Sequence, residues 1–362
     1  MKVLHVFKTY LPDSFTGIER VIWEIAEGLA PEGVESCVLS LGERVGAGRY
    51  PVGSHFGYQA KRDLYMASTG LSLSVFKAFR ELSRTADIVH YHFPWPMADL
   101  LHLLERPDRP TVVTYHSDIV RQRVLRRLYE PMMRRFLDGV DRIVATSPNY
   151  AESSAVLRRY RDKTSVIPIG LADEEAPSVA LVEEWRQRMG EGFFLFVGAL
   201  RYYKGLPFLL DAAERTGLPL VIAGKGAMEA EIRARKLPNL QLVETFSDRD
   251  KAALLHLCRA FVFPSHLRSE AFGVALLEAA RAGKPMISCE IGTGTTYVNL
   301  DGETGLAVPP ADAQALGEAM RKLAGDPQAV ARMGQAARAR YERLFKAEEM
   351  CRQYLGLYRT LS

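Results

Sequence analysis

The sequence predicts an α/β protein with two doubly wound parallel sheets, and three features of the chain support this fold class. Short runs of apolar residues recur from one end to the other, separated by longer segments with helical periodicity. The runs are continuously apolar, as expected for strands that helices cover on both faces. At 362 residues the chain is long enough for two domains of ordinary size.

The expected strands fall into two sets. In the first half they span 2–7, 36–41, 87–91, 110–115, 142–145 and 165–167, and in the second half 193–197, 219–223, 240–243, 260–263, 286–289 and 305–308. Between the sets, prolines, a glycine and acidic residues interrupt the rhythm at 167–177. We therefore expect one domain at 1–169 and a second at 170–346, followed by a last helix from Ala347 to Leu361. Ligands of such sheets bind in the loops at the carboxyl ends of the strands.

Composition argues against several classes of protein. No run reaches the ~18 apolar residues of a membrane span, and the first residues form a predicted strand rather than a signal peptide, so we expect a cytoplasmic protein. The four cysteines are far apart in sequence without a CxxC pair, which argues against a zinc site or a disulfide framework. A net charge of +4 is too small to imply nucleic-acid binding.

The stretch from 261 to 283 most directly suggests a ligand site. It predicts a buried strand, a polar loop with Glu270, and an apolar helix that begins near Gly273 and contains Glu278. Gly273 lets the backbone approach a ligand, and the free N–H groups and dipole of the helix favour an anion. The two carboxylates, roughly 12 Å apart along a helix, would then accept hydrogen bonds from hydroxyls at the two ends of a nucleotide sugar. The structural alternative is that Glu270 only stabilises the helix N-terminus while Glu278 pairs with Arg281.

A second candidate region follows the first strand of the second half. Arg201 and Lys204 are spaced so that both charges can hold one diphosphate, the arginine by its planar fork and the lysine as a point charge. A solvated basic turn is the alternative. Gly224 lies in a glycine-containing loop after the next strand, which lacks the spacing of a dinucleotide-binding fingerprint.

The first half contributes a glycine and several histidines. Gly17 begins a predicted helix and would let an amide approach phosphate, although a turn alone also explains it. His116 follows the fourth strand, where a parallel sheet opens towards its ligand, but a lone histidine is more often structural than catalytic. His90 and His92 end the preceding strand and either shape an acceptor pocket or pack in the core.

Glu270 and Glu278 form an E-x7-E motif, and with it the sequence resembles the retaining glycosyltransferases of family 4 over nearly its whole length. The resemblance implies the GT-B fold, in which two Rossmann-like domains face each other across a cleft. It implies that the last helix, here 347–362, packs back on the first domain. The first domain would bind the acceptor and the second a nucleotide diphosphate sugar, with no metal or other cofactor.

The same resemblance assigns roles to particular residues. His116 would bond a hydroxyl of the donor sugar and present its backbone carbonyl near the anomeric carbon, while Glu270 would hold the sugar hydroxyls and Glu278 the ribose. The expected catalytic set is His116, Arg201, Lys204 and Glu270, and the expected donor-binding set is Gly17, Arg201, Lys204, Gly224, Glu270, Ala271, Phe272, Gly273, Val274 and Glu278. The chain departs from the family at Thr16, where a glycine is usual, and at Ala199, where arginine is common.

Three segments, 8–21, 201–205 and 292–310, are most similar to bacterial mannosyl- and rhamnosyltransferases of surface polysaccharide assembly of the O-antigen type. This similarity implies a GDP-sugar donor and a glycan acceptor linked to polyprenyl diphosphate, as in lipopolysaccharide biosynthesis. A UDP-sugar donor remains an alternative, as does a nucleotide-sugar epimerase of the same architecture. A nucleic-acid-binding protein would leave the paired glutamates unexplained.

Two further patterns have simpler explanations. Asp248-Arg-Asp250 resembles the metal-binding DxD motif of another glycosyltransferase class, but Ser247 and Asp250 have the spacing of a helix capping box. Ala282-Gly-Lys284 lacks the Ser/Thr and the upstream glycine of a phosphate-binding P-loop.

A basic helix is expected between 119 and 137. A helical projection places Arg123, Arg126, Arg127 and Arg134 on one side and apolar residues on the other. Pro131 should kink it. The arginines form either an ordinary solvated face or a contact with anionic lipid headgroups, which attract each basic residue by about 1 kcal/mol. The second reading predicts peripheral attachment to the cytoplasmic face of the inner membrane.

Overall fold

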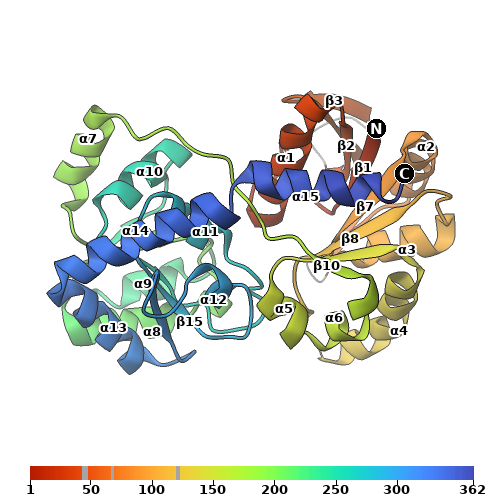
Figure 1. Cartoon of the computed structure of the whole chain (residues 1–362). Coiled ribbons are helices and arrows are strands. Elements are labelled where there is room, and N and C mark those ends of the chain that lie inside the picture. The colour runs from red at the N-terminus through yellow and green to blue at the C-terminus, as the bar shows by residue number, and fades with distance from the viewer. Residues whose placement is uncertain (43–47, 67–68, 120–122) are drawn as a thin grey trace. The chain divides into compact units, whose positions relative to one another are not determined.

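The computed structural model describes residues 1–42, 48–66, 69–119 and 123–362 of the chain. They form two compact units (Figure 1). Unit 1 consists of Met1–Ala172 together with Ala347–Ser362, and unit 2 of Asp173–Lys346. Each unit is described by itself below.

Unit 1 is built on an eight-stranded sheet. In spatial order its strands are β10 (Thr164–Val166), β9 (Arg142–Ala145), β8 (Thr111–Tyr115), β7 (Ile88–Phe93), β1 (Lys2–Val6), β2 (Glu35–Gly42), β4 (His55–Lys61) and β3 (Gly48–Val52). All neighbours are parallel except β3 with β4. A separate two-stranded ribbon pairs β5 (Leu64–Met66) with β6 (Thr69–Leu71).

The helices of unit 1 include one from the far end of the chain. In chain order they are α1 (Gly17–Leu29), the 3-10 turn η1 (Ala30–Glu32), α2 (Ser74–Thr85), α3 (Pro96–Glu105), α4 (Arg123–Gly139), α5 (Pro148–Ser153), α6 (Ala155–Arg159), η2 (Arg161–Lys163) and α15 (Ala347–Arg359). Helix α15 lies beside α1 (Figure 1), where the thiol of Cys351 donates to the Glu24 carbonyl at 3.4 Å. A Cβ at Gly28 would come within 2.5 Å of that sulfur, so a glycine permits this close contact.

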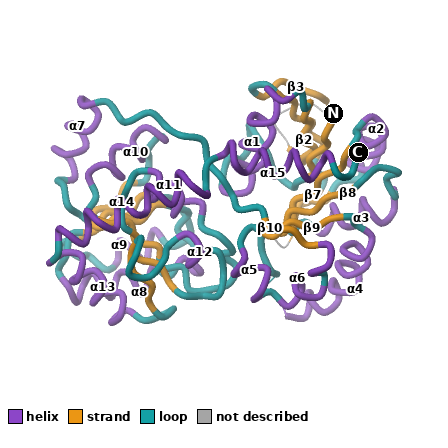
Figure 2. The backbone as a smooth tube through the Cα atoms, in the orientation of Figure 1, coloured by secondary structure: helices purple, strands orange, loops and turns teal. Residues whose placement is uncertain are grey.

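Unit 2 has a six-stranded sheet in which all neighbours are parallel. Its strands, in spatial order, are β13 (Leu240–Val243), β12 (Leu220–Ala223), β11 (Phe194–Val197), β14 (Ala260–Phe263), β15 (Met286–Cys289) and β16 (Gly305–Val308). Its helices are α7 (Val179–Met189), η3 (Tyr202–Lys204), α8 (Leu206–Thr216), α9 (Glu229–Ala234), α10 (Asp248–Leu257), α11 (Val274–Arg281), α12 (Thr295–Val298), α13 (Ala313–Gly325) and α14 (Pro327–Leu344). Figure 2 shows the strands inside a layer of helices.

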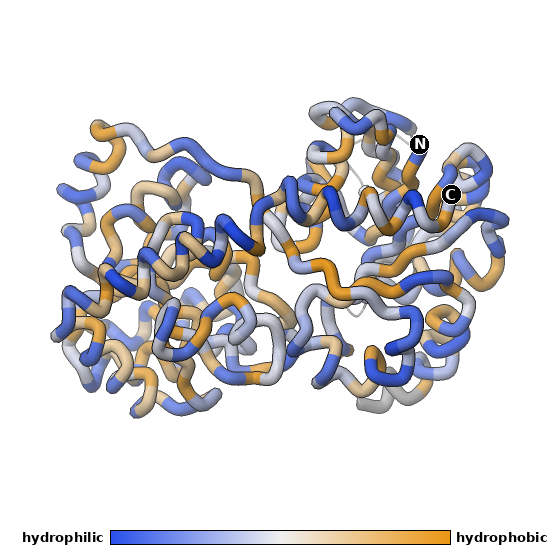
Figure 3. Tube along the Cα trace, viewed as in Figure 1, coloured by the Kyte–Doolittle hydropathy of each residue, from blue (hydrophilic) through white to orange (hydrophobic). Residues whose placement is uncertain are grey.

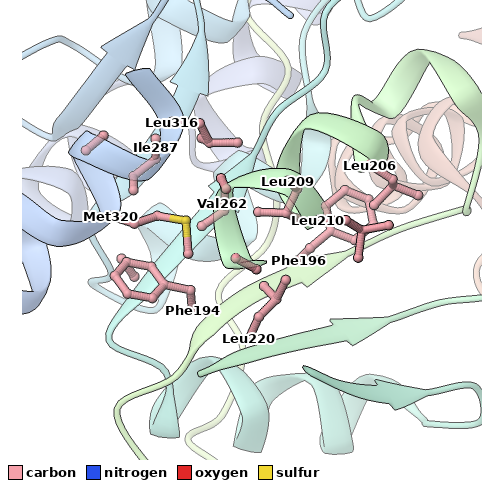
Figure 4. Close-up of a cluster of buried hydrophobic side chains, with 14 of the residues drawn as sticks. Phe194, Phe196, Leu206, Leu209, Leu210, Leu220, Val262, Ile287, Leu316 and Met320 are labelled. Carbon is pink, nitrogen blue, oxygen red and sulfur yellow. The ribbon is translucent and has the colours of Figure 1, made fainter. Parts of the chain in front are cut away.

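The core of unit 2 forms between its sheet and the helices that cover it. Phe194 and Phe196 of β11 contribute fully buried rings to the same cluster as Leu209 of α8 and Met320 of α13 (Figure 4). Helix α14 alternates between hydrophilic and hydrophobic positions (Figure 3), as expected of a helix with one face on a sheet. Burial of the apolar strands on both faces is therefore what stabilises this parallel arrangement.

All the strands expected from the sequence are present, within one or two residues at their ends. Strands β3 to β6 were not expected from the sequence. In β3 only alternate residues are half-buried, and Pro51 and Gly53 weaken the strand pattern at its end. Helix α4 continues through Pro131 to Gly139. Within the described part of the chain, no helix combines the length and the apolar composition needed to cross a bilayer.

Candidate functional site

The strand order of unit 2 reverses next to β11. From β11 the chain proceeds through β12 to β13 on one side, whereas β14 on its other side leads through β15 to β16. In open α/β sheets such a reversal leaves a crevice between the two loops at the carboxyl ends of the flanking strands, where ligands bind. The two loops here are 198–205 after β11 and 264–273 after β14.

A lysine from one of these loops is paired with a glutamate from the other. The ammonium of Lys204 donates to the carboxylate of Glu270, and the hydroxyl of Ser265 donates to the same carboxylate oxygen at 3.2 Å. The two charged side chains are only 12% and 14% exposed. The Lys204 nitrogen also lies 4.7 Å from the centroid of the Phe263 ring, which adds a cation–π contact. Two of the residues expected in the catalytic set are thus in direct contact.

Two glycines shape these loops, one where the loops approach each other and one at the start of α11. Gly205 has a left-handed φ of 71°, and a Cβ there would lie 1.9 Å from the carbonyl oxygen of Pro264. Gly273 has a φ of 88°, and a Cβ there would lie 2.9 Å from the Phe263 ring. Because an L side chain at either position would be strained and would collide, the backbone geometry requires glycine at both.

The start of α11 presents a row of free amides. Among the described residues, the backbone N–H groups of Ala271, Phe272, Gly273 and Val274 have no hydrogen-bond acceptor. The side chains of Ala271 and Phe272 are buried, so they anchor the loop rather than face a ligand. Such a row of donors at a helix N-terminus suits an anion.

A third loop supports this segment from behind. The hydroxyl of Thr293, which is fully buried, donates to the backbone carbonyl of Glu270 at 2.9 Å. The N–H of Gly294 donates to the carbonyl of Ala271 at 2.7 Å, and a Cβ on Gly294 would lie 2.6 Å from the Phe272 ring. Gly294 therefore belongs to the packing that positions Glu270.

Glu278 is paired with a residue that the sequence analysis did not identify. Its carboxylate, 7% exposed, accepts a hydrogen bond of 2.7 Å from the ammonium of Lys251 on α10. Lys251 also donates to Asp248 at 2.8 Å. Lys251 lies four residues after Ser247 within a helix, so nothing in its local sequence indicated this contact with α11.

The remaining donor-site candidates in unit 2 lie near the same strand ends. The side chain of Arg201 is exposed, just before η3. Gly224 follows β12, and a Cβ there would lie 2.0 Å from the carbonyl oxygen of Gly198, so this glycine is needed for packing against the loop after β11. The amide of Leu200 completes the contact by donating to Lys225 at 2.9 Å.

In unit 1 the loop before α1 is held together by a glutamate. Glu19, 4% exposed, accepts hydrogen bonds from the hydroxyls of Thr9, Ser14 and Thr16 at 2.6, 2.9 and 2.9 Å. Gly17 begins α1, is exposed and has no heavy atom within 4 Å of the position of a Cβ. Packing within the chain does not require a glycine at 17, which leaves room for close approach of a ligand.

His116 lies at the end of β8 and is joined to other histidines. Its Nε2 is 3.0 Å from Nδ1 of His92, and Nε2 of His92 is 3.2 Å from Nδ1 of His5. Burial lowers the pKa of His116 to about 3, and burial together with the charge of His55 lowers the pKa of His5 to about 3. Burial, with the neighbouring rings, also holds the pKa of His92 well below its usual value. All three rings are therefore neutral at pH 7.

The two aspartates of the DxD-like pattern have other partners. Asp250 and Ser247 form the capping box of α10, with Asp250 also accepting from the indole of Trp185 at 2.8 Å. Burial works to raise the pKa of Asp250, but the hydrogen bonds from Ser247 and Trp185 lower it overall. Asp248 accepts from Lys251.

The basic helix is described only in part. The side chains of Arg123, Arg126 and Arg127 lie outside the described residues. Arg134 is exposed and paired with Glu130 one turn earlier.

Comparisons with known proteins identify the family. Residues 15–175 match the family described as Glycosyltransferase Family 4, and residues 180–340 match the one described as Glycosyl transferases group 1. The chain is 54% identical over 353 residues to D-rhamnosyltransferase WbpZ of Pseudomonas aeruginosa, covering 96% of this chain and 93% of that protein. The chain is a family 4 glycosyltransferase.

One further relative agrees with this assignment, and one solved structure has a similar fold. O-antigen chain mannosyltransferase C of Escherichia coli is 49% identical over 366 residues, covering all of this chain and 99% of its own. Sucrose-phosphate synthase of Thermosynechococcus elongatus has a similar structure, with a TM-score of 0.84 at 20% identity over 99% of this chain and 98% of that one. This likeness confirms the GT-B class of fold that the family resemblance implied.

Proposed function

We propose that this glycosyltransferase moves a mannosyl or rhamnosyl group, with retention of anomeric configuration, from a GDP-sugar to a lipid-linked glycan acceptor in surface polysaccharide synthesis. The names of the two relatives that match almost the whole chain support the sugar and the pathway. The observation that carries the donor site is the Lys204–Glu270 pair beside the free amides of α11, at the reversal of strand order in unit 2.

The chemical task is to stabilise negative charge on the departing diphosphate while the sugar becomes cationic. The bond between the anomeric carbon and the phosphate oxygen breaks, a bond to the acceptor oxygen forms on the same face, and the acceptor's proton passes to the leaving phosphate. Arg201, Lys204 and the amides of residues 271–274 supply positive charge and donors for that phosphate. These groups make a metal ion unnecessary in the proposed mechanism. Gly17 contributes a further amide.

Before the donor binds, the ion pair between Lys204 and Glu270 holds both side chains ready for their proposed contacts with the phosphate and the sugar. In a site only 12% to 14% exposed, an unpaired ammonium or carboxylate would be poorly solvated, so mutual pairing compensates both groups and orders their side chains. When the donor binds, the phosphate would take Lys204 as its counter-ion and sugar hydroxyls would donate to Glu270. Glu278, held by Lys251, would accept hydrogen bonds from the ribose, and His116 would bond a sugar hydroxyl.

A lipid-linked acceptor would require unit 1 to work at the cytoplasmic face of a membrane. The predicted basic side of α4, with Arg123, Arg126, Arg127 and Arg134, is the proposed contact with anionic headgroups. A few arginines give only reversible attachment. The protein should therefore sediment with anionic vesicles at low salt and come off as salt screens the charges. Equal sedimentation with neutral vesicles would contradict the proposed contact.

Nucleotide release with a panel of sugars tests the proposal. The purified chain is incubated with GDP-mannose, GDP-rhamnose or UDP-glucose, with and without a polyprenyl-diphosphate-linked glycan. We expect GDP release that depends on the acceptor, and a product whose new linkage keeps the donor's anomeric configuration. UDP release would replace the proposed donor. A changed sugar on an intact nucleotide, formed without acceptor, would instead indicate an epimerase.

A further inference from the structure

Three histidines of unit 1 form a continuous hydrogen-bonded chain through the sheet. His5 lies on β1, His92 on the neighbouring strand β7, and His116 directly after the next strand, β8. The contacts run from Nδ1 of His5 to Nε2 of His92 at 3.2 Å, and from Nδ1 of His92 to Nε2 of His116 at 3.0 Å. His5 and His92 are fully buried and His116 is 6% exposed.

The protons in such a chain are coupled. A neutral imidazole carries one N–H and one lone pair, so each ring that accepts at one nitrogen must donate at the other. The chain therefore has two arrangements. Either His5 donates to His92 and His92 donates to His116, or both hydrogen bonds run in the opposite direction. The choice at one end fixes which nitrogen of His116 carries its proton.

The unpaired end of the chain favours one direction. Nε2 of His5 is buried and has no hydrogen-bond partner among the described residues. If the chain ran from His116 to His5, this nitrogen would be an N–H without an acceptor in the core, an arrangement that folded proteins avoid. In the other direction His5 carries its proton on Nδ1, where His92 accepts it, and only a lone pair remains unpaired.

We infer that His5 and His92 are positioning residues that fix His116 as the Nδ1–H tautomer, so that His116 acts as a hydrogen-bond donor to its ligand. Nδ1 of His116 has no bonding partner in the described part of the chain. Because the inference rests on the proposed function for the identity of that ligand, the acceptor would be a hydroxyl oxygen of the donor sugar. A His116 ring whose Nδ1 is fixed as a donor binds a hydroxyl through the hydroxyl's oxygen, and does not suit a hydroxyl that must donate its own proton at that position.

A metal site at the same place is the competing explanation. One ring nitrogen each of His5, His90 and His92 lies within 4.8 Å of the others. However, His90 is already bonded on both nitrogens, to Tyr358 and to Thr114, each at 2.7 Å. Hydrogen bonding therefore accounts for this cluster better than metal binding.

Nitrogen NMR of the histidine side chains tests the inference independently of activity. The full chain, labelled with 15N-histidine, has eight histidines to assign by single replacement. At pH 7.5 we expect His116 to carry its proton on Nδ1 in the wild type. In His92→Phe, which keeps a ring but removes both nitrogens, His116 should shift towards the Nε2–H tautomer that histidine prefers in water.

Two further variants keep the test decisive. His5→Phe should give a smaller shift in the same direction, and it serves if His92→Phe does not fold. Tyr358→Phe is the matched control, because it removes the hydroxyl that bonds His90 in the same buried cluster and leaves the hydrogen bonds between His5, His92 and His116 unchanged. It should leave the His116 tautomer unchanged.

Activity supplies a second readout. His92→Phe should lower kcat/KM for sugar transfer about 3- to 10-fold, the size of one neutral hydrogen bond, while Tyr358→Phe leaves it unchanged. A wild-type His116 protonated on Nε2, or a tautomer that His92→Phe does not move, would overturn the inference. If no donor sugar is transferred by a protein whose His116 carries the proton on Nδ1, the proposed function fails and the tautomer assignment stands.

Discussion

Replacing Lys204 with methionine separates a catalytic role from a structural one. The substitution keeps an unbranched side chain, one heavy atom shorter, and removes its charge, so the leaving diphosphate loses a charged donor in a poorly solvated site. Removing one such donor commonly lowers kcat by about 100- to 1,000-fold. We expect a loss of this size, and a comparable loss for Glu270→Gln, in nucleotide release driven by the lipid-linked acceptor.

The effect of Lys204→Met on the stability of the fold should be much smaller than its effect on activity. Glu270 keeps its hydrogen bond from Ser265 and is 14% exposed, so without Lys204 it can recruit water. We expect Lys204→Met to lower the free energy of unfolding by about 1–2 kcal/mol, which corresponds to a fall in Tm of roughly 2–8 °C for a unit of this size. Lys322→Ala, at an exposed position on α13, is the control. A large loss of stability in Lys204→Met with unchanged activity per folded molecule would refute the catalytic assignment.

Three other predictions follow from the structure. Turnover should persist in EDTA, because in the proposed mechanism fixed cations and amides would serve the diphosphate. A loss that Mg²⁺ or Mn²⁺ restores would contradict that mechanism. The folded protein should lose stability as the pH falls from 6.5 towards 3. His5 and His116 have pKa values of about 3 in the folded protein, whereas the unfolded chain takes up the same protons near pH 6.5. Each of these histidines therefore lowers the free energy of unfolding by about 1.4 kcal/mol per pH unit in that range, which urea midpoints measured against pH would show. Gly205→Ala should destabilise unit 2 by more than about 2 kcal/mol, because the new Cβ would collide with Pro264. The control is Gly217→Ala, which has a similar φ of 67° but open space around it, so it should cost only about 1 kcal/mol for its left-handed backbone. Equal thermal shifts in the two variants would contradict the packing argument.

Most strands could be predicted from the sequence because each is a short, continuously apolar run, a pattern that can be recognised without knowing its neighbours. A continuous apolar run such as 194–197 has few alternatives to a central parallel strand. The hairpin of β3 and β4 was missed because it lies at the edge of the sheet, where one face is partly solvated and glycine and proline interrupt the pattern.

The site was predicted less completely, because pairing between distant segments is not encoded in spacing. The sequence singled out Lys204 and Glu270 separately, and their contact depends on the close approach of the loops after β11 and β14, which Gly205 permits at Pro264. It suggested Arg281 as a structural partner of Glu278 but did not indicate Lys251, which the structure places against that carboxylate. Only the positions of α10 and α11 relative to each other could reveal this.

The histidines illustrate the same point in unit 1. His116 and His92 drew attention as ends of neighbouring strands, but His5 lies far from both in sequence and resembles any polar residue in a first strand. The strand order changes direction between β1 and β7, so these two strands are neighbours although 81 residues separate Val6 from Ile88. In unit 2 the residues proposed to face the substrate lie directly at the reversal of strand order, because there no crossover helix covers the loops. In unit 1, His116 follows β8, one strand beyond the reversal between β1 and β7. The row of imidazoles therefore begins at the reversal, on β1 and β7, and continues one strand further to His116 after β8. Because each of these three histidines comes from a different strand or strand end, only the order of the strands in the sheet brings them into one hydrogen-bonded row.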